Sequence, residues 1–288
     1  MQIETIQNCN ARCVMCGINE WHRETNKMSD SLFLKVSNEL FEYKDVIQRV
    51  SVFLGGEPLL DKKLAEKISI LKNGGIKNVF FTTNASLMFK DRALEILESG
   101  ITQIDISLDS LKKEIYEKIR VGLKFDEVIN NVLGLIELRN SGNFDTRIRI
   151  RITQMDCNAN EIEDFRKFFK DNFKEGDSVY SKNLNTFFME GELKDDVKQF
   201  TGFSKYKSDE FIYPKLPCYT LWNTMIILSD GRVGLCCVDM GRNVILGDLR
   251  KNTIKEVWQG ESYKKIREIH LKDGRGAMKE CTNCATWI

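Results

Sequence analysis

The stretch Gln2-Ile3-Glu4-Thr5-Ile6-Gln7-Asn8-Cys9-Asn10-Ala11-Arg12-Cys13-Val14-Met15-Cys16 sets an apolar, strand-like run directly before three closely spaced cysteines. Three cysteines so close together cannot all be core residues of one regular element. Three thiolates also leave a [4Fe–4S] cluster one ligand short, since such a cluster normally takes four cysteines. One iron would then be open to a small molecule. A three-thiolate zinc site and chance spacing are the alternatives.

Outward from this stretch, strand-like and helix-like segments alternate. The first strand is expected at 2–7, and five further apolar, β-branched runs follow at 50–54, 78–82, 103–108, 147–152 and about 179–187. Helical patterns lie between them, at 61–73, 88–98, 125–139 and 159–170. Six β-α repeats predict an α/β fold with a parallel sheet and covering helices. Right-handed crossovers then give either a barrel or a doubly wound sheet.

Polar motifs follow three of the predicted strands at the same end. These motifs are Gly55-Gly56-Glu57-Pro58, Thr82-Thr83-Asn84 and Ser107-Leu108-Asp109-Ser110. In a β/α barrel the active site is built from loops at the carboxyl ends of the strands. Two glycines allow close backbone approach, and a carboxylate beside an open iron suits an ammonium group. Each motif alone is an ordinary turn, strand exit or helix cap. Their occurrence in order predicts one shared site.

The predicted fifth strand carries three alternating arginines. Arg147, Arg149 and Arg151 alternate with isoleucines, so all three lie on one face. If helices cover the isoleucines, the arginines point into the barrel. Arg149 and Arg151 are therefore candidates to bind an anionic or multiply hydroxylated substrate, or the carboxylate of a cofactor. The alternative is an open edge where the arginines are merely solvated.

The C-terminal part of the chain has a different pattern. Residues 187–217 are polar and irregular and are interpreted as a linker. Residues 225–235 predict a β-hairpin across Asp230-Gly231, followed by helices at about 253–258 and 261–271. On the second of these helices, His270 lies on a Lys-rich face and is expected to be solvated.

A second set of cysteines lies in this part. Cys218, Cys236, Cys281 and Cys284 supply four thiolates from a hairpin and a tail, which can close a metal site completely. A zinc ribbon is the simplest alternative. Cys157 and Cys237 are left over. Each is expected to be a structural thiol, with hydrogen donation as the other possibility; Cys237 could also be an alternative ligand.

Composition excludes several classes of protein. The 288 residues include 43 Lys and Arg against 42 Asp and Glu, a formal charge of +1, which gives no general grip on nucleic acid or on an anionic membrane. A mean hydropathy of −0.32 and the lack of a long apolar run argue against a membrane span. Met1 leads straight into a strand with no signal peptide, and nine clustered cysteines do not form a disulfide framework. We therefore expect a cytoplasmic protein.

With these motifs in order, residues 1–187 resemble the radical S-adenosylmethionine (radical SAM) enzymes. The resemblance implies a partial (β/α)6 TIM-like barrel, with Cys9, Cys13 and Cys16 holding a [4Fe–4S] cluster. It also implies a set of SAM-binding residues around that cluster: Gly55, Gly56, Glu57, Thr83, Asn84, Ser107, Asp109 and Arg120. The cluster would cleave SAM reductively, and the resulting radical would abstract hydrogen from a C–H bond.

Residues 218–288 resemble the twitch domain, a shortened SPASM domain of these enzymes. The resemblance implies one auxiliary [4Fe–4S] cluster on Cys218, Cys236, Cys281 and Cys284, so two clusters in all, with 188–217 as a bridging segment. A full SPASM domain has further cysteines after the final pair. Because the sequence stops at Ile288, ligands for a second auxiliary cluster are not expected.

Among enzymes of this group, the chain most resembles aminocyclitol and sugar dehydrogenases. We expect a small polar or anionic substrate to be oxidised to a carbonyl, with a flavodoxin or ferredoxin as one-electron donor. Two alternatives stay open. An epimerase would return hydrogen from Cys157 or Cys237, and a peptide-modifying enzyme would act on a ribosomally made peptide. Such modifiers often carry a leader-recognition domain, which is not expected here because the first strand starts the sequence.

Overall fold

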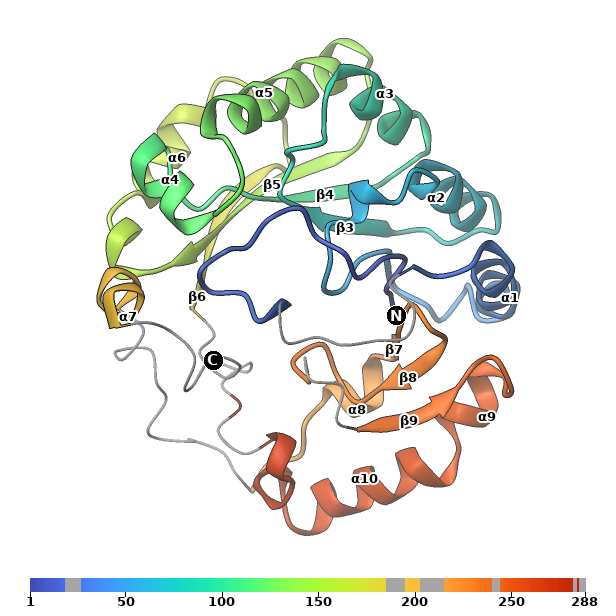
Figure 1. The fold of residues 1–288 in the computed structure, drawn as a ribbon. Helices are drawn as coiled ribbons and strands as arrows, with labels where there is room; N and C mark the ends of the chain where they lie inside the picture. The colour runs from blue at the N-terminus through green and yellow to red at the C-terminus, as the bar shows by residue number, and fades with distance from the viewer. Residues whose placement is uncertain (19–26, 185–194, 203–214, 240–243, 282–283, 285–288) are drawn as a thin grey trace.

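The computed structural model describes residues 1–18, 27–184, 195–202, 215–239, 244–281 and 284 (Figure 1). A curved sheet forms the centre of the fold. Its first six strands are parallel neighbours in chain order: β1 (Gln2–Ile3), β2 (Val50–Ser51), β3 (Val79–Thr83), β4 (Gln103–Ser107), β5 (Arg147–Gln154) and β6 (Ser178–Asn183). This is the predicted α/β fold, a partial TIM-like barrel.

Helices cover the convex side of this sheet (Figure 1). They are α1 (Asp30–Phe41), α2 (Leu64–Asn73), α3 (Lys90–Glu98), α4 (Lys113–Ile119), α5 (Phe125–Ser141) and α6 (Ile162–Phe169). Each presents an apolar stripe to the strands; in α5 the stripe includes Val128, Val132 and Leu135, all fully buried. The buried isoleucines of β5 face the same layer, so its arginines face the concave side.

The C-terminal residues extend the same sheet. They form α8 (Thr220–Asn223), β7 (Ile226–Ile227), β8 (Arg232–Gly234), β9 (Ile245–Asp248), α9 (Ile254–Trp258) and α10 (Glu261–Lys272). Strand β7 pairs in parallel with β1, and β7, β8 and β9 continue as antiparallel neighbours. The order of the described strands is therefore β6-β5-β4-β3-β2-β1-β7-β8-β9, and one apolar core runs through barrel and C-terminal unit.

The predicted element types are confirmed, with some differences. Strands β1 and β2 are shorter than expected because only their first residues pair before the chain turns into the loops of the site. Helices α1 and α4 and strand β9 were not predicted. The segment 188–217 was expected to be irregular, but it contains α7 (Asp195–Thr201). The predicted last strand ends at Asn183, and residues 185–187 lie outside the described part of the chain.

Candidate active site

The cysteine loop, residues 9–16, leaves β1 and lies on the concave side of the sheet (Figure 1). It runs along the end of α4. The amide of Arg12 donates to the carbonyl of Val121 at 2.8 Å, and the amide of Val14 donates to the carbonyl of Ile119 at 3.0 Å. Backbone pairing of this kind fixes a segment that has no regular structure of its own.

The three thiols of this loop lie close enough to influence one another. Burial raises the pKa of the Cys16 thiol to about 11, and the neighbouring Cys13 and Cys9 raise it further. Burial also raises the pKa of Cys9, and Glu57 and Cys13 add to that shift. None of the nine cysteines forms a disulfide. Three free thiols sharing one pocket fit a cluster that would take three ligands from the protein.

The Gly55-Gly56-Glu57 turn docks directly on the residues that precede the first cysteine. The Glu57 amide donates to the Asn8 carbonyl at 2.8 Å. A Cβ on Gly56 would stand 2.5 Å from the carbonyl oxygens of both Gln7 and Asn8, so only glycine allows this approach. The turn at 55–57 and the residues that precede Cys9 are therefore in direct contact.

The Glu57 carboxylate is buried and ties this turn to the exit of β3. Its Oε1 accepts from the Thr83 hydroxyl at 2.6 Å and from the Leu59 amide at 3.1 Å, and its Oε2 accepts from the Asn84 amide at 2.8 Å. Burial nevertheless raises the pKa of Glu57 to about 7. Three hydrogen bonds thus fix the position of the carboxylate. A cation bound nearby would lower its raised pKa.

Residues that follow β3 also form side-chain hydrogen bonds with the cysteine loop. The Asn84 side chain donates to Asn10 Oδ1 at 3.0 Å, and Asn10 donates to Ser86 Oγ at 2.8 Å. The turn includes Ala85, which is fully buried and left-handed at φ 59°. A non-glycine residue in that conformation costs about 1 kcal/mol or more, so the surrounding contacts must hold it.

Arg120 and Asp109 form a buried pair beside the cysteine loop. Arg120 Nε donates to Asp109 Oδ2 at 2.6 Å, and Arg120 Nη1 lies 3.5 Å from Cys13 Sγ. The other Asp109 oxygen accepts from the Thr153 amide at 2.7 Å. Both oxygens of Asp109 are therefore engaged by the protein, and it acts on the site by orienting Arg120.

The concave face of β4, β5 and β6 carries further polar groups. Asp105 accepts two hydrogen bonds from Arg149, at 2.8 and 2.6 Å, and one from the Tyr180 hydroxyl at 3.2 Å. Ser107 Oγ accepts from Arg151 Nη2 at 2.9 Å. Sequence reasoning missed Asp105 and Tyr180. The signal available was period two, since Tyr180 lies opposite Arg151 in the strand register.

The two cysteines outside the predicted ligand sets, Cys157 and Cys237, pack in different apolar clusters. Cys157, in the short 3₁₀ helix Asp156–Asn158, packs in a small apolar cluster with Val14 and Met15 of the cysteine loop. Burial raises the pKa of its thiol to about 11, so it is protonated at neutral pH. Cys237 follows β8 and packs against Leu54 and the buried side chains of the C-terminal unit.

The second set of thiols, Cys218, Cys236, Cys281 and Cys284, comes from three segments of the C-terminal unit. Burial raises the pKa of Cys281 to about 12, and Cys218 and Cys284 raise it further. Burial likewise raises the pKa of Cys236, with Cys281 among the contributing neighbours. Cys281 thus lies within electrostatic range of the three other thiols of this set, which come from separate segments, and such a set is compatible with a four-ligand cluster.

His270 lies next to this set. It is fully buried, so the expectation that it is solvated was wrong. It points inward with Tyr263 and Ile266 on the buried stripe of α10, and its Nδ1 accepts from the Cys218 amide at 3.1 Å. Burial lowers the pKa of His270, so the ring is neutral and carries its proton on Nε2.

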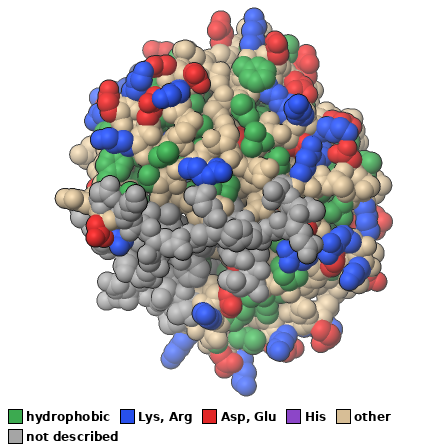
Figure 2. Space-filling model, in the orientation of Figure 1, with side chains coloured by type: hydrophobic (Ala, Val, Ile, Leu, Met, Phe, Trp, Pro, Cys, Tyr) green, Lys and Arg blue, Asp and Glu red, His purple; other side chains and the backbone are tan. Residues whose placement is uncertain are grey.

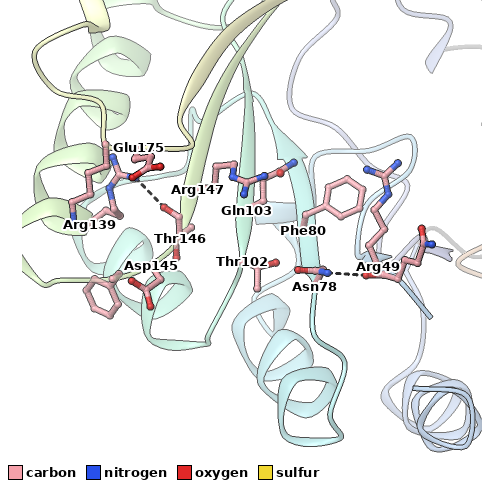
Figure 3. A pocket seen from close by; sticks show the side chains of 13 residues that line it. Arg49, Asn78, Phe80, Thr102, Gln103, Arg139, Asp145, Thr146, Arg147 and Glu175 are labelled. Carbon is pink, nitrogen blue, oxygen red and sulfur yellow. Dashed lines mark hydrogen bonds between the residues drawn. The ribbon is translucent and has the colours of Figure 1, made fainter. Parts of the chain in front are cut away.

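Within the described ranges, no three His, Cys, Asp or Glu side chains are arranged to hold a single metal ion. A cavity of about 720 Å³ lies at the opposite, amino ends of β3, β4 and β5 (Figure 3). It is lined by residues of both charges, including Arg49, Arg147 and Glu175. Positive and negative side chains are also interspersed over the coloured part of the face in Figure 2.

Comparison with known sequences agrees with this geometry. The sequence profile of the radical SAM superfamily matches residues 3–168, more than half of the chain. The profile of an iron–sulfur cluster-binding domain, SPASM, matches residues 218–285. These domains imply a [4Fe–4S] cluster with SAM in the first and further iron–sulfur binding in the second. No helix in the described residues has the length and apolarity needed to cross a membrane.

Several of the curated relatives that match are named as GTP 3′,8-cyclases. A probable GTP 3′,8-cyclase of Methanococcus maripaludis is 32% identical over 157 residues, which is 54% of this chain and 49% of the relative. The chain thus spans about half the length of that relative. A GTP 3′,8-cyclase of Clostridium botulinum is 26% identical over 241 residues, covering 74% of this chain and 73% of the relative.

Solved structures share the fold at low identity. BtrN in complex with AdoMet and 2-DOIA has a TM-score of 0.63 at 16% identity, covering 99% of this chain and 92% of BtrN. anSMEcpe with bound AdoMet has a TM-score of 0.65 at 17% identity, covering 94% and 83%. Streptococcus suis SuiB bound to precursor peptide SuiA has a TM-score of 0.67 at 19% identity, covering 92% and 66%.

Proposed function

Because the chain belongs to the radical SAM superfamily, we propose that it abstracts hydrogen from a C–H bond of a small polar, sugar- or aminocyclitol-like substrate and oxidises that carbon to a carbonyl. The observation that carries this proposal is the position of the polar concave face of β4–β6. It lies inside the barrel that holds the cysteine loop, and the C-terminal unit extends the same sheet.

In this proposal the first site is held by the cysteine loop. Cys9, Cys13 and Cys16 ligate one cluster and leave one iron position without a protein ligand. When bound, that cluster and SAM supply reductive cleavage and hydrogen-atom abstraction. The chain's own residues bind and orient SAM through the turn at 55–57, Thr83, Asn84 and Ser107. Arg120, steadied by Asp109, supplies positive charge beside Cys13.

The C-terminal unit holds the auxiliary cluster in the same proposal, on Cys218, Cys236, Cys281 and Cys284. Oxidation of an alcohol carbon to a carbonyl removes one hydrogen atom, one proton and one further electron. The auxiliary cluster, held by the C-terminal unit on the same sheet, would supply an acceptor for that electron. A flavodoxin- or ferredoxin-like protein would deliver the electron that starts each turnover.

BtrN, solved with AdoMet and 2-DOIA, supports a small-molecule substrate because the shared fold spans nearly all of both chains, 99% of this one and 92% of BtrN, whereas SuiB is matched over 66% of its length. The test is anaerobic reconstitution with iron and sulfide. About eight irons per chain and absorption near 400 nm are expected of two cubanes. Incubation with SAM, dithionite and a panel of aminocyclitols and sugar alcohols should then give a product two hydrogen masses lighter. A colourless protein that binds only zinc contradicts the proposal.

Cys157 favours a second candidate, radical epimerisation. Its protonated thiol packs against the same small apolar cluster as Val14 and Met15 of the cysteine loop, which makes it a candidate to return a hydrogen atom. An epimerase gives a product of unchanged mass that gains one deuterium in D2O. Loss of turnover in Cys157→Ala, with SAM cleavage retained, supports it; the same loss in Cys237→Ala assigns the donor there. GTP and a candidate peptide belong in the same panel, because relatives are named as GTP 3′,8-cyclases and SuiB is solved with a precursor peptide.

A further inference from the structure

The arginines of β5 differ in how their charge is used. Arg149 makes a two-point ion pair with Asp105, at 2.8 and 2.6 Å, and its guanidinium lies 4.7 Å from the centre of the Tyr180 ring. Tyr180 donates to the same carboxylate. Arg149 is therefore neutralised within the protein, and its charge is not available to a ligand.

Arg151, one pleat further along the same face, has no such partner. The only side-chain hydrogen bond of Arg151 to the described residues goes from Nη2 to the neutral Ser107 hydroxyl at 2.9 Å. Its Nε is buried and has no acceptor in the described part of the chain. No described Asp or Glu lies within ion-pair distance of it. A buried donor without an acceptor costs about 1–3 kcal/mol, which a ligand oxygen would recover.

Lys182 stands diagonally across from Arg151. The register pairs Arg151 with Tyr180 and Thr153 with Lys182, so Lys182 extends the same concave face on β6. No described carboxylate pairs with it either. The Lys182 side chain is exposed. Desolvation and the neighbouring positive charge of Arg151 lower its pKa, and Asp105 raises it.

We propose that Arg151 and Lys182 form a two-cation subsite that binds an anionic group, a carboxylate or a phosphate, carried by the substrate. The inference rests on the proposed function, because it places the substrate on the concave face. A guanidinium donates two parallel hydrogen bonds to such a group, and an ammonium adds a point charge. The neutral Arg149–Asp105–Tyr180 group would form the adjoining wall.

The carboxylate of SAM is the other anion that could reach this face. The substrate is favoured because a different cation, Arg120, lies beside the cysteine loop, 3.5 Å from Cys13 Sγ. Lys182 lies on β6, diagonally across from Arg151 and away from Arg120 in the strand order. Arg151 and Lys182 therefore belong to the β5–β6 part of the concave face, next to the Arg149–Asp105–Tyr180 group.

The test uses the reconstituted full chain with SAM bound, and inorganic phosphate as the probe. Arg151→Gln and Lys182→Gln should each weaken phosphate binding at least tenfold in calorimetry, while Arg151→Lys, which keeps the charge, should stay closer to the unchanged protein. Arg147→Gln is the matched control. It removes the same charge from the same face of β5, but at the opposite end of the strand, in the cavity of Figure 3. Its phosphate affinity should not change.

Affinity for SAM itself separates the two sources of anion. The proposal expects SAM affinity within about twofold of the unchanged protein in all four variants. It is overturned if the unchanged protein with SAM does not bind phosphate, or if all variants bind it equally. It is also overturned if Arg151→Gln and Lys182→Gln weaken SAM rather than phosphate. Failure of the proposed function looks different: reduced, unchanged protein then releases no 5′-deoxyadenosine from SAM, whatever its phosphate affinity.

Discussion

The two sets of thiols are built in opposite ways. The first comes from one loop of eight residues, and distant segments come to it: the turn at Gly56, the exit of β3 and Arg120. The second is assembled from three separate segments, at Cys218, Cys236 and the Cys281–Cys284 turn, within a small unit packed on α10. Three thiols from one loop supply too few ligands for a [4Fe–4S] cluster, so the first site depends on the surrounding segments. Four thiols supply all the ligands that such a cluster takes.

Removing one thiol from the first set is the strongest way to break this comparison. Cys13→Ala should abolish SAM cleavage and lower iron from about eight to about four per chain, because the first cluster loses a ligand it cannot replace. The checks are iron analysis and 5′-deoxyadenosine release under dithionite. SAM cleavage that survives would mean Cys13 is not a ligand.

The matching change in the second set should have a narrower effect. Cys281→Ala should lose the same number of irons, again about four, yet retain SAM cleavage in the absence of substrate. The same two measurements apply. If Cys281→Ala removes all iron, the two sites depend on each other and the contrast drawn above is wrong.

The next largest effect is expected from the buried ion pair between Arg120 and Asp109, beside the first set of thiols. Arg120→Met leaves Asp109 charged and buried, so the free energy of unfolding of the iron-free protein should fall by about 3–5 kcal/mol. Lys113→Met, which removes half of the exposed pair with Asp126, is the control and should have a much smaller effect, because solvent screens that pair. Urea unfolding measures both, and equal losses would contradict a special role for the Arg120 pair.

Glu57 should give the first site a pH signature. Its pKa is raised from 4.5 to about 7, so the folded protein holds a proton that the unfolded chain has already lost. Unfolding free energy of the iron-free protein should therefore fall as the pH rises from about 4.5 to 7, by roughly 3 kcal/mol from this group. Urea unfolding of Glu57→Gln across that range should lack this component. An unchanged slope would place the pKa shift elsewhere.

The smallest expected effect concerns the second set. His270→Phe leaves the Cys218 amide without its acceptor and should cost about 1–3 kcal/mol in unfolding free energy. His270→Asn offers a side-chain oxygen in place of Nδ1 and should cost less. If asparagine costs as much as phenylalanine, the hydrogen bond does not hold Cys218 in position.

Much of the fold and of the first site could be predicted from the sequence, because the patterns that indicate them involve residues close together in the chain. Alternating Arg and Ile identified β5, and the three-cysteine spacing identified the loop. Helix α4 was missed because it is only seven residues long, with just Tyr116 and Ile119 buried. The Arg149–Asp105 pair was missed because it depends on the register between β4 and β5. His270 was misjudged because its flanking lysines hid a stripe that packs inward.

The pairing of β1 with β7 has a consequence for how the chain is made. The Gln2 amide donates to the Met225 carbonyl and the Glu4 amide to the Ile227 carbonyl, so β1 waits for β7, which is synthesised much later. At about 5–20 residues per second, that wait is roughly 10–45 s. During it the β7 side of β1 is an unpaired edge, open to association with other chains, directly before the cysteine loop. The strand that leads into the cysteine loop thus lacks one of its two neighbours until β7 has been made.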